Sequence, residues 1–162
     1  MLMTNKFQQG FIVAVSLLAA FYIQELPSSN VLQLVLPEWP FLIVLYFSVS
    51  SHFFFGIVVA FGVGLIEDVF LGMPVLGLHA GIYAISAFVM LALQNRFEHI
   101  NLVTQTLIIG VMVLFKLIVI TLFASIWYSP SLHFWAFLSI PISMLMWPLL
   151  NLMFAFFPSR YQ

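Results

Sequence analysis

The chain has no cysteine and few charged residues among its 162 residues. Without cysteine it forms no disulfide, has no thiolate nucleophile and cannot build a cysteine-based zinc site. Only 6% of its residues are charged, whereas soluble domains carry about 25%. Four basic and five acidic side chains do not cover a water-facing surface of this size. We therefore expect the surface to face lipid.

The formal net charge is −1, and no cluster of Lys or Arg has the size that phosphate recognition requires. We expect no nucleic acid among the partners. Instead, 64% of the residues are hydrophobic, including 19 Phe. The long apolar runs predict an all-α polytopic membrane protein, in which residues 1–162 form a single integral membrane domain surrounded by membrane lipid.

The first apolar run, Phe11 to Ile23, follows Lys6 and superficially resembles a signal peptide. A clear small-x-small cleavage site is missing before Glu25 and Pro27. We interpret the run as a retained transmembrane helix.

The number of spans depends on the segment from Trp39 to Ile66. A spanning helix needs about 20 apolar residues, so this segment is long for one helix and short for two. One helix here gives five spans, and a turn at Ser50-Ser51-His52 gives six. Polar breaks separate the remaining apolar runs, which lie at residues 76–93, 102–127 and 134–157.

The positions of the basic residues favour six spans. With six spans and a cytoplasmic N-terminus, Lys6, Arg96 and Arg160 all lie on the cytoplasmic side, whereas five spans move one of them outside. The positive-inside rule therefore predicts two short or tilted helices within residues 39–72, and both termini in the cytoplasm. Five spans remain the alternative.

Three charged residues fall within predicted spans, where charges are costly and mark pairing or function. Counted at 1.5 Å per residue from the inner face, Asp68 and Lys116 lie at depths of about 22 and 21 Å. We expect Lys116 to form an ion pair with Asp68 or Glu67. Because neighbouring residues point about 100° apart on a helix, we expect only one of the two acidic residues to face inward.

Two other interpretations of these charges stay open. Lys116 extends to the outer interface and pairs with nothing, as long basic side chains near helix ends do. Alternatively, the charges form a polar site for a ligand or a partner helix.

Small residues recur on the third and fourth spans of the six-span arrangement. Gly64, Asp68 and Gly72 are four residues apart, so they share one helix face, and glycine there permits close backbone approach. The face is either a seam for a partner helix or a packing surface within this protein. The glycines of this region are Gly56, Gly62, Gly64, Gly72, Gly77 and Gly81.

Recognisable catalytic and metal-binding patterns are missing from the sequence. No two of the four histidines are three or four residues apart, and no H-E-x-x-H or G-x-S-x-G motif occurs. We expect no enzyme activity, no metal site and no cofactor.

Four stretches carry a family resemblance that covers nearly the whole chain. They are Leu36-Pro-Glu-Trp-Pro-Phe-Leu-Ile-Val-Leu-Tyr46, Gly62-Val-Gly-Leu-Ile-Glu-Asp-Val-Phe-Leu-Gly72, Val75-Leu-Gly-Leu78 and Met146-Trp-Pro-Leu149. In order and spacing they resemble the rod shape-determining protein MreD family of bacteria. The residues that match the family pattern are Pro37, Gly64, Asp68, Gly72, Gly77 and Pro148. Glu38 and Glu67 depart from it, where a small polar and an apolar residue are expected.

The resemblance implies a non-enzymatic scaffold of the cell-elongation machinery in the bacterial inner membrane. Its implied partners are an MreC-type single-pass protein and, directly or indirectly, MreB-type actin-like filaments and peptidoglycan synthases. The resemblance also implies a fold similar to the six-helix substrate-binding subunits of vitamin transporters.

The same residues permit a second function, that of a small-molecule-binding membrane subunit of a vitamin-type importer. Glu25, Glu67, Asp68 and Lys116 would then line a polar site near the outer face. Such a pocket needs several convergent polar groups, and the sequence offers few. A lipid transporter is a third alternative.

Overall fold

The computed structural model describes residues 6–24, 26, 36–50, 56–73, 75–97, 99–127 and 134–155. This part of the chain is almost entirely helical and contains no strand, which confirms the predicted all-α fold. Its elements are α1 (Lys6–Gln24), α3 (Trp39–Ser50), α4 (Ile57–Phe70), α5 (Leu78–Phe97), α6 (Leu102–Trp127), the 3-10 helix η1 (Phe134–Leu138) and α7 (Ser139–Ala155).

Two separate helices, α3 and α4, occupy the segment from which the sequence predicted either five or six spans. α3 ends at Ser50 and α4 begins at Ile57, so the described part of the chain contains six α-helices, in agreement with the six-helix prediction. Their 12 and 14 residues span about 18 and 21 Å, less than a hydrocarbon core of about 30 Å. Both are therefore short helices, as expected. The predicted turn itself, with Ser51 and His52, lies outside the described residues, as do Glu25 and Arg160.

Three helical segments are long and apolar enough to cross a membrane, in the part of the chain that the structure covers. They are Leu78–Phe97, Leu102–Ile126 and Ala136–Phe154. The first continues four residues beyond the predicted end at residue 93, because Phe97 is buried and packs edge-on against Trp147 at a centroid distance of 5.9 Å. The polar residues Asn95 and Arg96 lie on the exposed side of that last turn.

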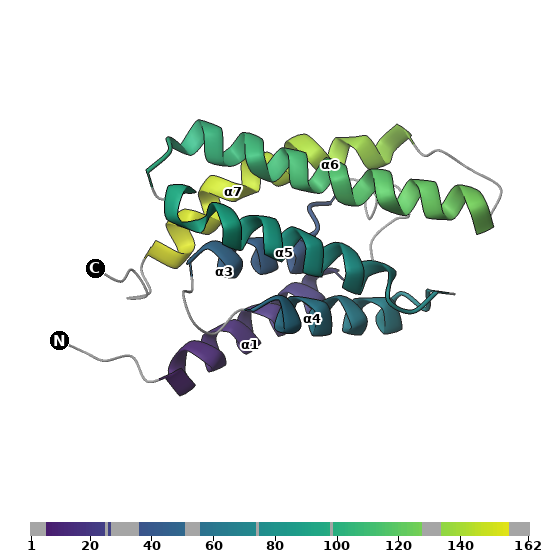
Figure 1. Cartoon of the computed structure of the whole chain (residues 1–162), viewed down its shortest axis with the longest axis horizontal. Helices are drawn as coiled ribbons and strands as arrows, with labels where there is room; N and C mark the ends of the chain where they lie inside the picture. Colours follow the sequence, from purple (N-terminus) through teal and green to yellow (C-terminus); the bar gives the residue numbers. More distant parts are fainter. Residues whose placement is uncertain are drawn as a thin grey trace.

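The central helix is α3. Every residue from Pro40 to Val49 is buried, because α1, α5 and α7 all pack against this helix. Figure 1 shows α6 and α7 on one side of the bundle, α1 and α4 on the other, and α3 and α5 between them. A helix that is enclosed on all sides needs no polar face, in agreement with the almost wholly apolar sequence of α3.

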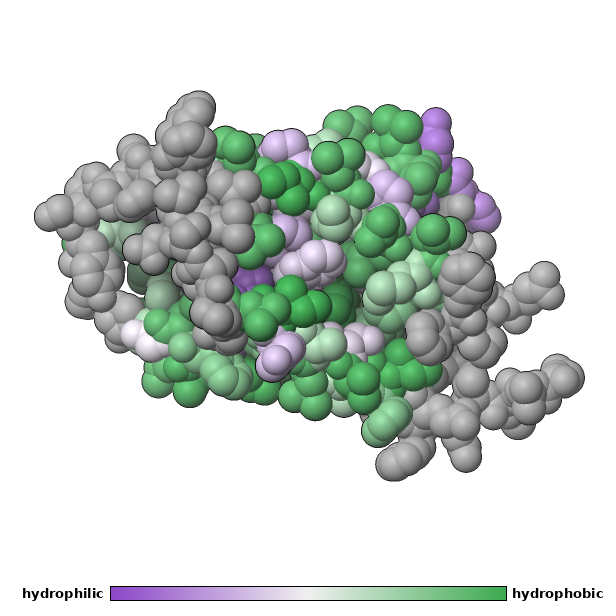
Figure 2. All heavy atoms as spheres, turned by 180° about the vertical axis from the view of Figure 1, so that it is seen from behind, coloured by the Kyte–Doolittle hydropathy of each residue, from purple (hydrophilic) through white to green (hydrophobic). Residues whose placement is uncertain are grey.

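The outward faces of the helices are hydrophobic. In α6, exposed apolar residues recur every three or four positions and form one stripe along the helix. Figure 2 shows that hydrophobic residues dominate the face seen there. This surface suits lipid rather than water. The stripe consists of Leu107, Val111, Leu114, Ile118 and Leu122.

The turn between α4 and α5 depends on two glycines with positive φ. Gly72, at φ +58°, ends α4 in a Schellman motif: its N–H bonds the carbonyl of Val69 at 3.2 Å, and the N–H of Met73 bonds the carbonyl of Asp68 at 3.0 Å. Gly77, at φ +107°, directly precedes α5. Residues with a Cβ rarely adopt such angles, so both positions favour glycine.

Candidate functional site

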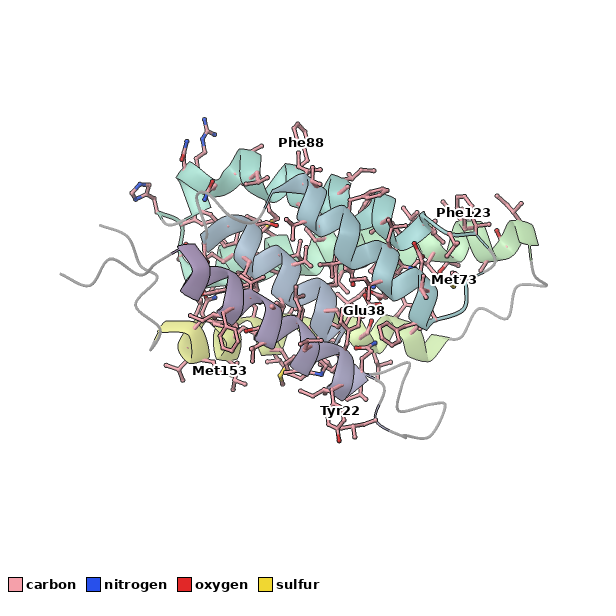
Figure 3. The ribbon with its side chains drawn as sticks, turned by 90° about the horizontal axis from the view of Figure 1, so that it is seen from below. Tyr22, Glu38, Met73, Phe88, Phe123 and Met153 are labelled. Carbon is pink, nitrogen blue, oxygen red and sulfur yellow. The ribbon has the colours of Figure 1, made fainter. Side chains whose placement is uncertain are left out.

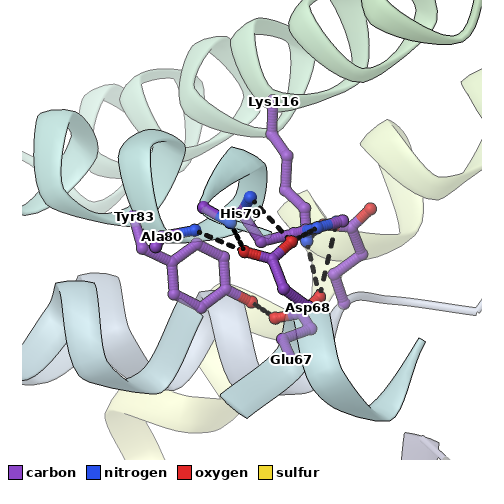
Figure 4. Close-up of polar contacts among 8 residues, drawn as sticks. Glu67, Asp68, His79, Ala80, Tyr83 and Lys116 are labelled. Carbon is purple, nitrogen blue, oxygen red and sulfur yellow. Dashed lines mark hydrogen bonds and ion pairs between the residues drawn. The ribbon is translucent and has the colours of Figure 1, made fainter. Parts of the chain in front are cut away.

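Six side chains from four parts of the chain meet near one end of the bundle, and we call them the charged cluster. Glu38 directly precedes α3, Glu67 and Asp68 lie near the end of α4, and Lys116 comes from the middle of α6. The other two, His79 and Tyr83, lie in the first turns of α5. Figure 4 shows how the cluster converges, and Figure 3 shows Glu38 among the helices while Tyr22 and Met153 lie on the outside.

Lys116 connects two carboxylates from different parts of the chain. Its Nζ lies 3.0 Å from Oε1 of Glu67 and 2.6 Å from Oε2 of Glu38. The ammonium also lies 5.2 and 5.1 Å from the ring centroids of Phe41 and Tyr83, within range of cation–π attraction. Only 1% of Lys116 is exposed. The alternative in which this side chain extends to the interface and pairs with nothing is therefore wrong.

Both carboxylate oxygens of Glu67 have partners. Oε1 accepts a hydrogen bond from Lys116, and Oε2 accepts one from the hydroxyl of Tyr83. Hydrogen bonds to an ionised carboxylate are stronger than those between neutral groups. The glutamate, which departs from the family pattern, thus links α4 to both α5 and α6.

Asp68 caps the helix that follows its own. Its Oδ2 accepts hydrogen bonds from the backbone N–H of Gly77 at 2.8 Å and of Ala80 at 3.4 Å. Its Oδ1 accepts the backbone N–H of His79 at 3.1 Å and lies 2.9 Å from Nδ1 of the same residue. The first N–H groups of a helix lack partners within it and attract negative charge, so the carboxylate is well placed at the start of α5.

The expectation that only one of Glu67 and Asp68 faces inward is wrong, because both are buried. The end of α4 has neighbours on two sides. Asp68 points to the start of α5, while Glu67 points to Lys116 of α6. Side chains about 100° apart on one helix are both enclosed when neighbours cover both directions.

Gly64 allows α4 and α5 to pack very closely. A Cβ at this position would lie 2.5 Å from Cα of Ala80, closer than real contacts allow. The seam at Gly64 is therefore a packing surface within the protein. Gly56, Gly62 and Gly81, by contrast, have nothing within 4 Å of such a Cβ.

The remaining residues of the family pattern lie in different places. Pro37 is buried next to the charged cluster, directly before Glu38, whose carbonyl accepts the N–H of Leu42 at 3.0 Å in the first turn of α3. Pro148 lies inside α7 beside Trp147. The indole ring of Trp147 contacts Tyr46 and Phe97, which lie near the ends of α3 and α5, away from the charged cluster.

Three members of the charged cluster were not identified as site residues from the sequence. From the sequence, Glu38 stands out only as a departure from the family pattern, His79 is only one of four histidines without ligand spacing, and Tyr83 carries no expected role. A usable signal existed for the last two, because a short glycine turn brings the start of α5 back to the end of α4. The position of Glu38 depends on the direction in which α3 runs, which the local sequence does not contain.

The fold and the site together define a polytopic helical membrane protein whose described buried charges are held by ion pairs and by the first N–H groups of α5. The family model described as rod shape-determining protein MreD matches residues 4–157, so the chain belongs to the MreD family. Membership gives this membrane protein a role in determining rod shape, in a family of structural proteins that is not known as enzymatic. No curated protein and no solved structure matches the chain.

Proposed function

We propose that the protein is a non-enzymatic scaffold of the elongation machinery, a single integral membrane domain in the bacterial inner membrane with both termini in the cytoplasm. It binds an MreC-type single-pass partner and helps couple MreB-type filaments to the peptidoglycan synthases outside. The observation that carries this proposal is the match of residues 4–157 to the rod shape-determining family.

The contacts of the charged cluster also support a scaffold. Glu67, Asp68 and Lys116 are held by one another, by Tyr83 and by the start of α5, so their hydrogen-bonding capacity serves to connect helices. A binding pocket would instead present polar groups that are free to bind a ligand. The apolar outward faces suit contact with lipid or with a partner's transmembrane helix.

Cell shape after depletion tests the role in the cell. We expect rods to become round before growth stops, and we expect a plasmid copy of the wild-type chain to restore them. Unchanged rods, with a growth defect that an added nutrient relieves, would contradict the scaffold and support the importer alternative.

Co-purification tests the partner. A tagged chain extracted in several mild detergents should retain the host's MreC-type protein. An unrelated single-pass membrane protein of similar abundance is the control and should be lost on washing. Loss of both proteins in every detergent would count against direct binding, even if depletion changes cell shape.

A further inference from the structure

The helices form two groups that differ in their neighbours. In the first, α1 packs on α3, α3 on α5 and α5 on α4; in the second, α6 packs along α7. We call the first the four-helix group and the second the hairpin. Figure 1 shows the hairpin lying along one side of the four-helix group. The two groups touch where α5 packs on α6 and α3 on α7. Side-chain contacts near the two ends of the bundle are among those that join them.

At one end the contacts are aromatic. Phe154 stacks on Tyr46 at a centroid distance of 4.6 Å and meets Phe47 edge-on at 5.2 Å. Trp147 meets Phe97 edge-on at 5.9 Å and lies 6.0 Å from Tyr46. We call these five residues the aromatic cluster. They bring α7 against the ends of α3 and α5, and each such ring pair adds about 0.5–1.5 kcal/mol to the effect of burial.

At the other end the contacts are ionic. Lys116 is the only formally charged residue in the sequence of α6, and its ammonium reaches two carboxylates of the four-helix group. Glu67 has a second donor in Tyr83, which belongs to the same group. The side chain of Glu38 is 22% exposed, so the ion pair lies at the margin of the buried region. Asp68 contacts α5 and takes no part in joining the hairpin.

We propose that Lys116, Glu38 and Glu67 form a latch, which holds the hairpin closed at this end while the aromatic cluster acts as its pivot. Opening moves the end of the hairpin that contains Lys116 away from α3 and α4. The end that contains Phe154 stays in place. This device goes beyond the scaffold role and stands on the contacts alone.

Physical chemistry in the bilayer explains why an ion pair can control this contact. Lipid tails are as apolar as Leu, so separating two apolar helix faces in a membrane costs only packing contacts. A buried ion pair adds little net stability, because desolvation offsets the attraction, but losing one partner leaves a costly unpaired charge. The latch therefore selects one arrangement of two packed units rather than supplying the stability of either unit.

Distance measurements on spin labels test the proposal, and the absence of cysteine means that no native thiol interferes. One labelled pair, Val69→Cys with Leu122→Cys, joins α4 to α6 at the latch end. A second pair, Val58→Cys with Val103→Cys, joins the same helices at the aromatic end. All four positions are exposed. The full chain in lipid nanodiscs should give a single narrow distance for each pair.

Removing the latch should change one end only. In Lys116→Met, we expect the Val69–Leu122 distance to broaden or gain a longer component, while the Val58–Val103 distance stays narrow. The neutral triple variant Glu38→Gln, Glu67→Gln and Lys116→Met leaves no unpaired charge, so it provides the same reading if Lys116→Met fails to fold. The control Arg96→Met removes an exposed cation from α5 and should leave both distances as in the unsubstituted chain.

Two results would overturn the proposal. A narrow, unchanged latch-end distance in the neutral triple variant would mean that apolar packing alone holds the hairpin. Equal broadening at both ends would mean general loosening, without a pivot at the aromatic cluster.

Discussion

Asp68 accepts the backbone N–H of Gly77 at 2.8 Å, nine residues along the chain and on the far side of a turn. The carboxylate at the end of one helix thereby caps the beginning of the next. This arrangement explains why a charge is tolerated at a fully buried position, since backbone N–H groups that lack helical partners stabilise it by hydrogen bonds.

Substitution of Asp68 should weaken the α4–α5 pair. Asp68→Ala leaves the N–H groups at the start of α5 without their acceptor, and loss of a helix cap costs about 0.5–2 kcal/mol, more where water is excluded. Asp68→Asn retains one acceptor oxygen and should lose less. Thermal unfolding in detergent, monitored by size-exclusion chromatography, should show the lower midpoint for Asp68→Ala and a smaller decrease for Asp68→Asn.

His79→Ala is the control for the cap. It removes the imidazole next to Asp68 but keeps the backbone N–H of residue 79, so it should be the mildest of the three variants. A loss equal to that of Asp68→Ala would show that the side-chain contact, and not the cap, holds the two helices.

A matched glycine pair tests the close contact between α4 and α5. Gly64→Ala places a Cβ 2.5 Å from the backbone of Ala80, and such overpacking costs about 1–3 kcal/mol. Gly62→Ala meets nothing within 4 Å and gains helix propensity of about 1 kcal/mol, so its stability should be unchanged or higher. Thermal unfolding in the same detergent should separate the two.

Partner binding offers a second reading of these variants. Gly62→Ala leaves the fold intact, so reduced retention of an MreC-type protein by this variant would identify the open face of α4 as the partner seam. Unchanged retention would exclude that position from the seam.

A double-mutant cycle should measure the ion pair. Lys116→Met and Glu67→Gln each leave a charge with fewer partners, so the double variant should be more stable than the sum of the single losses predicts, by roughly 0.5–3 kcal/mol. Arg96→Met combined with Glu67→Gln is the control, and it should be additive within about 0.5 kcal/mol because Arg96 lies near the other end of α5. Additivity in both cycles would mean that the 3.0 Å contact contributes no coupling.

The two turn glycines should differ in their tolerance of asparagine. Gly72 has φ +58°, within the left-handed region that Asn adopts, so Gly72→Asn should cost less than about 1 kcal/mol. Gly77 has φ +107°, outside that region, so Gly77→Asn should lower the unfolding midpoint clearly further. Equal losses would show that φ is not what requires glycine at these positions.

Most helices could be predicted from the sequence, but their ends could not. Apolar runs of sufficient length predict helices in lipid because the backbone must satisfy its own hydrogen bonds there. The end of α5 was placed too early at residue 93. It continues to Phe97 because that ring packs on Trp147, some 50 residues later in the chain.

The charged cluster was likewise predictable only in part. The helical rise of 1.5 Å per residue placed Lys116 level with the end of α4, and the two do meet. The same arithmetic did not choose between Asp68 and Glu67. It also gave no reason to include Glu38. This residue meets Lys116 only because the start of α3 and the end of α4 lie at the same end of the bundle.

By itself, the sequence determined that this protein is a helical membrane protein and that its buried charges share one level. These properties follow from composition and from the rise along each helix, which are local. Only the tertiary structure decided which carboxylate pairs with Lys116, which one caps α5, and that Gly64 packs inside the protein. These depend on how each helix is rotated about its axis, and contacts between distant segments set that rotation.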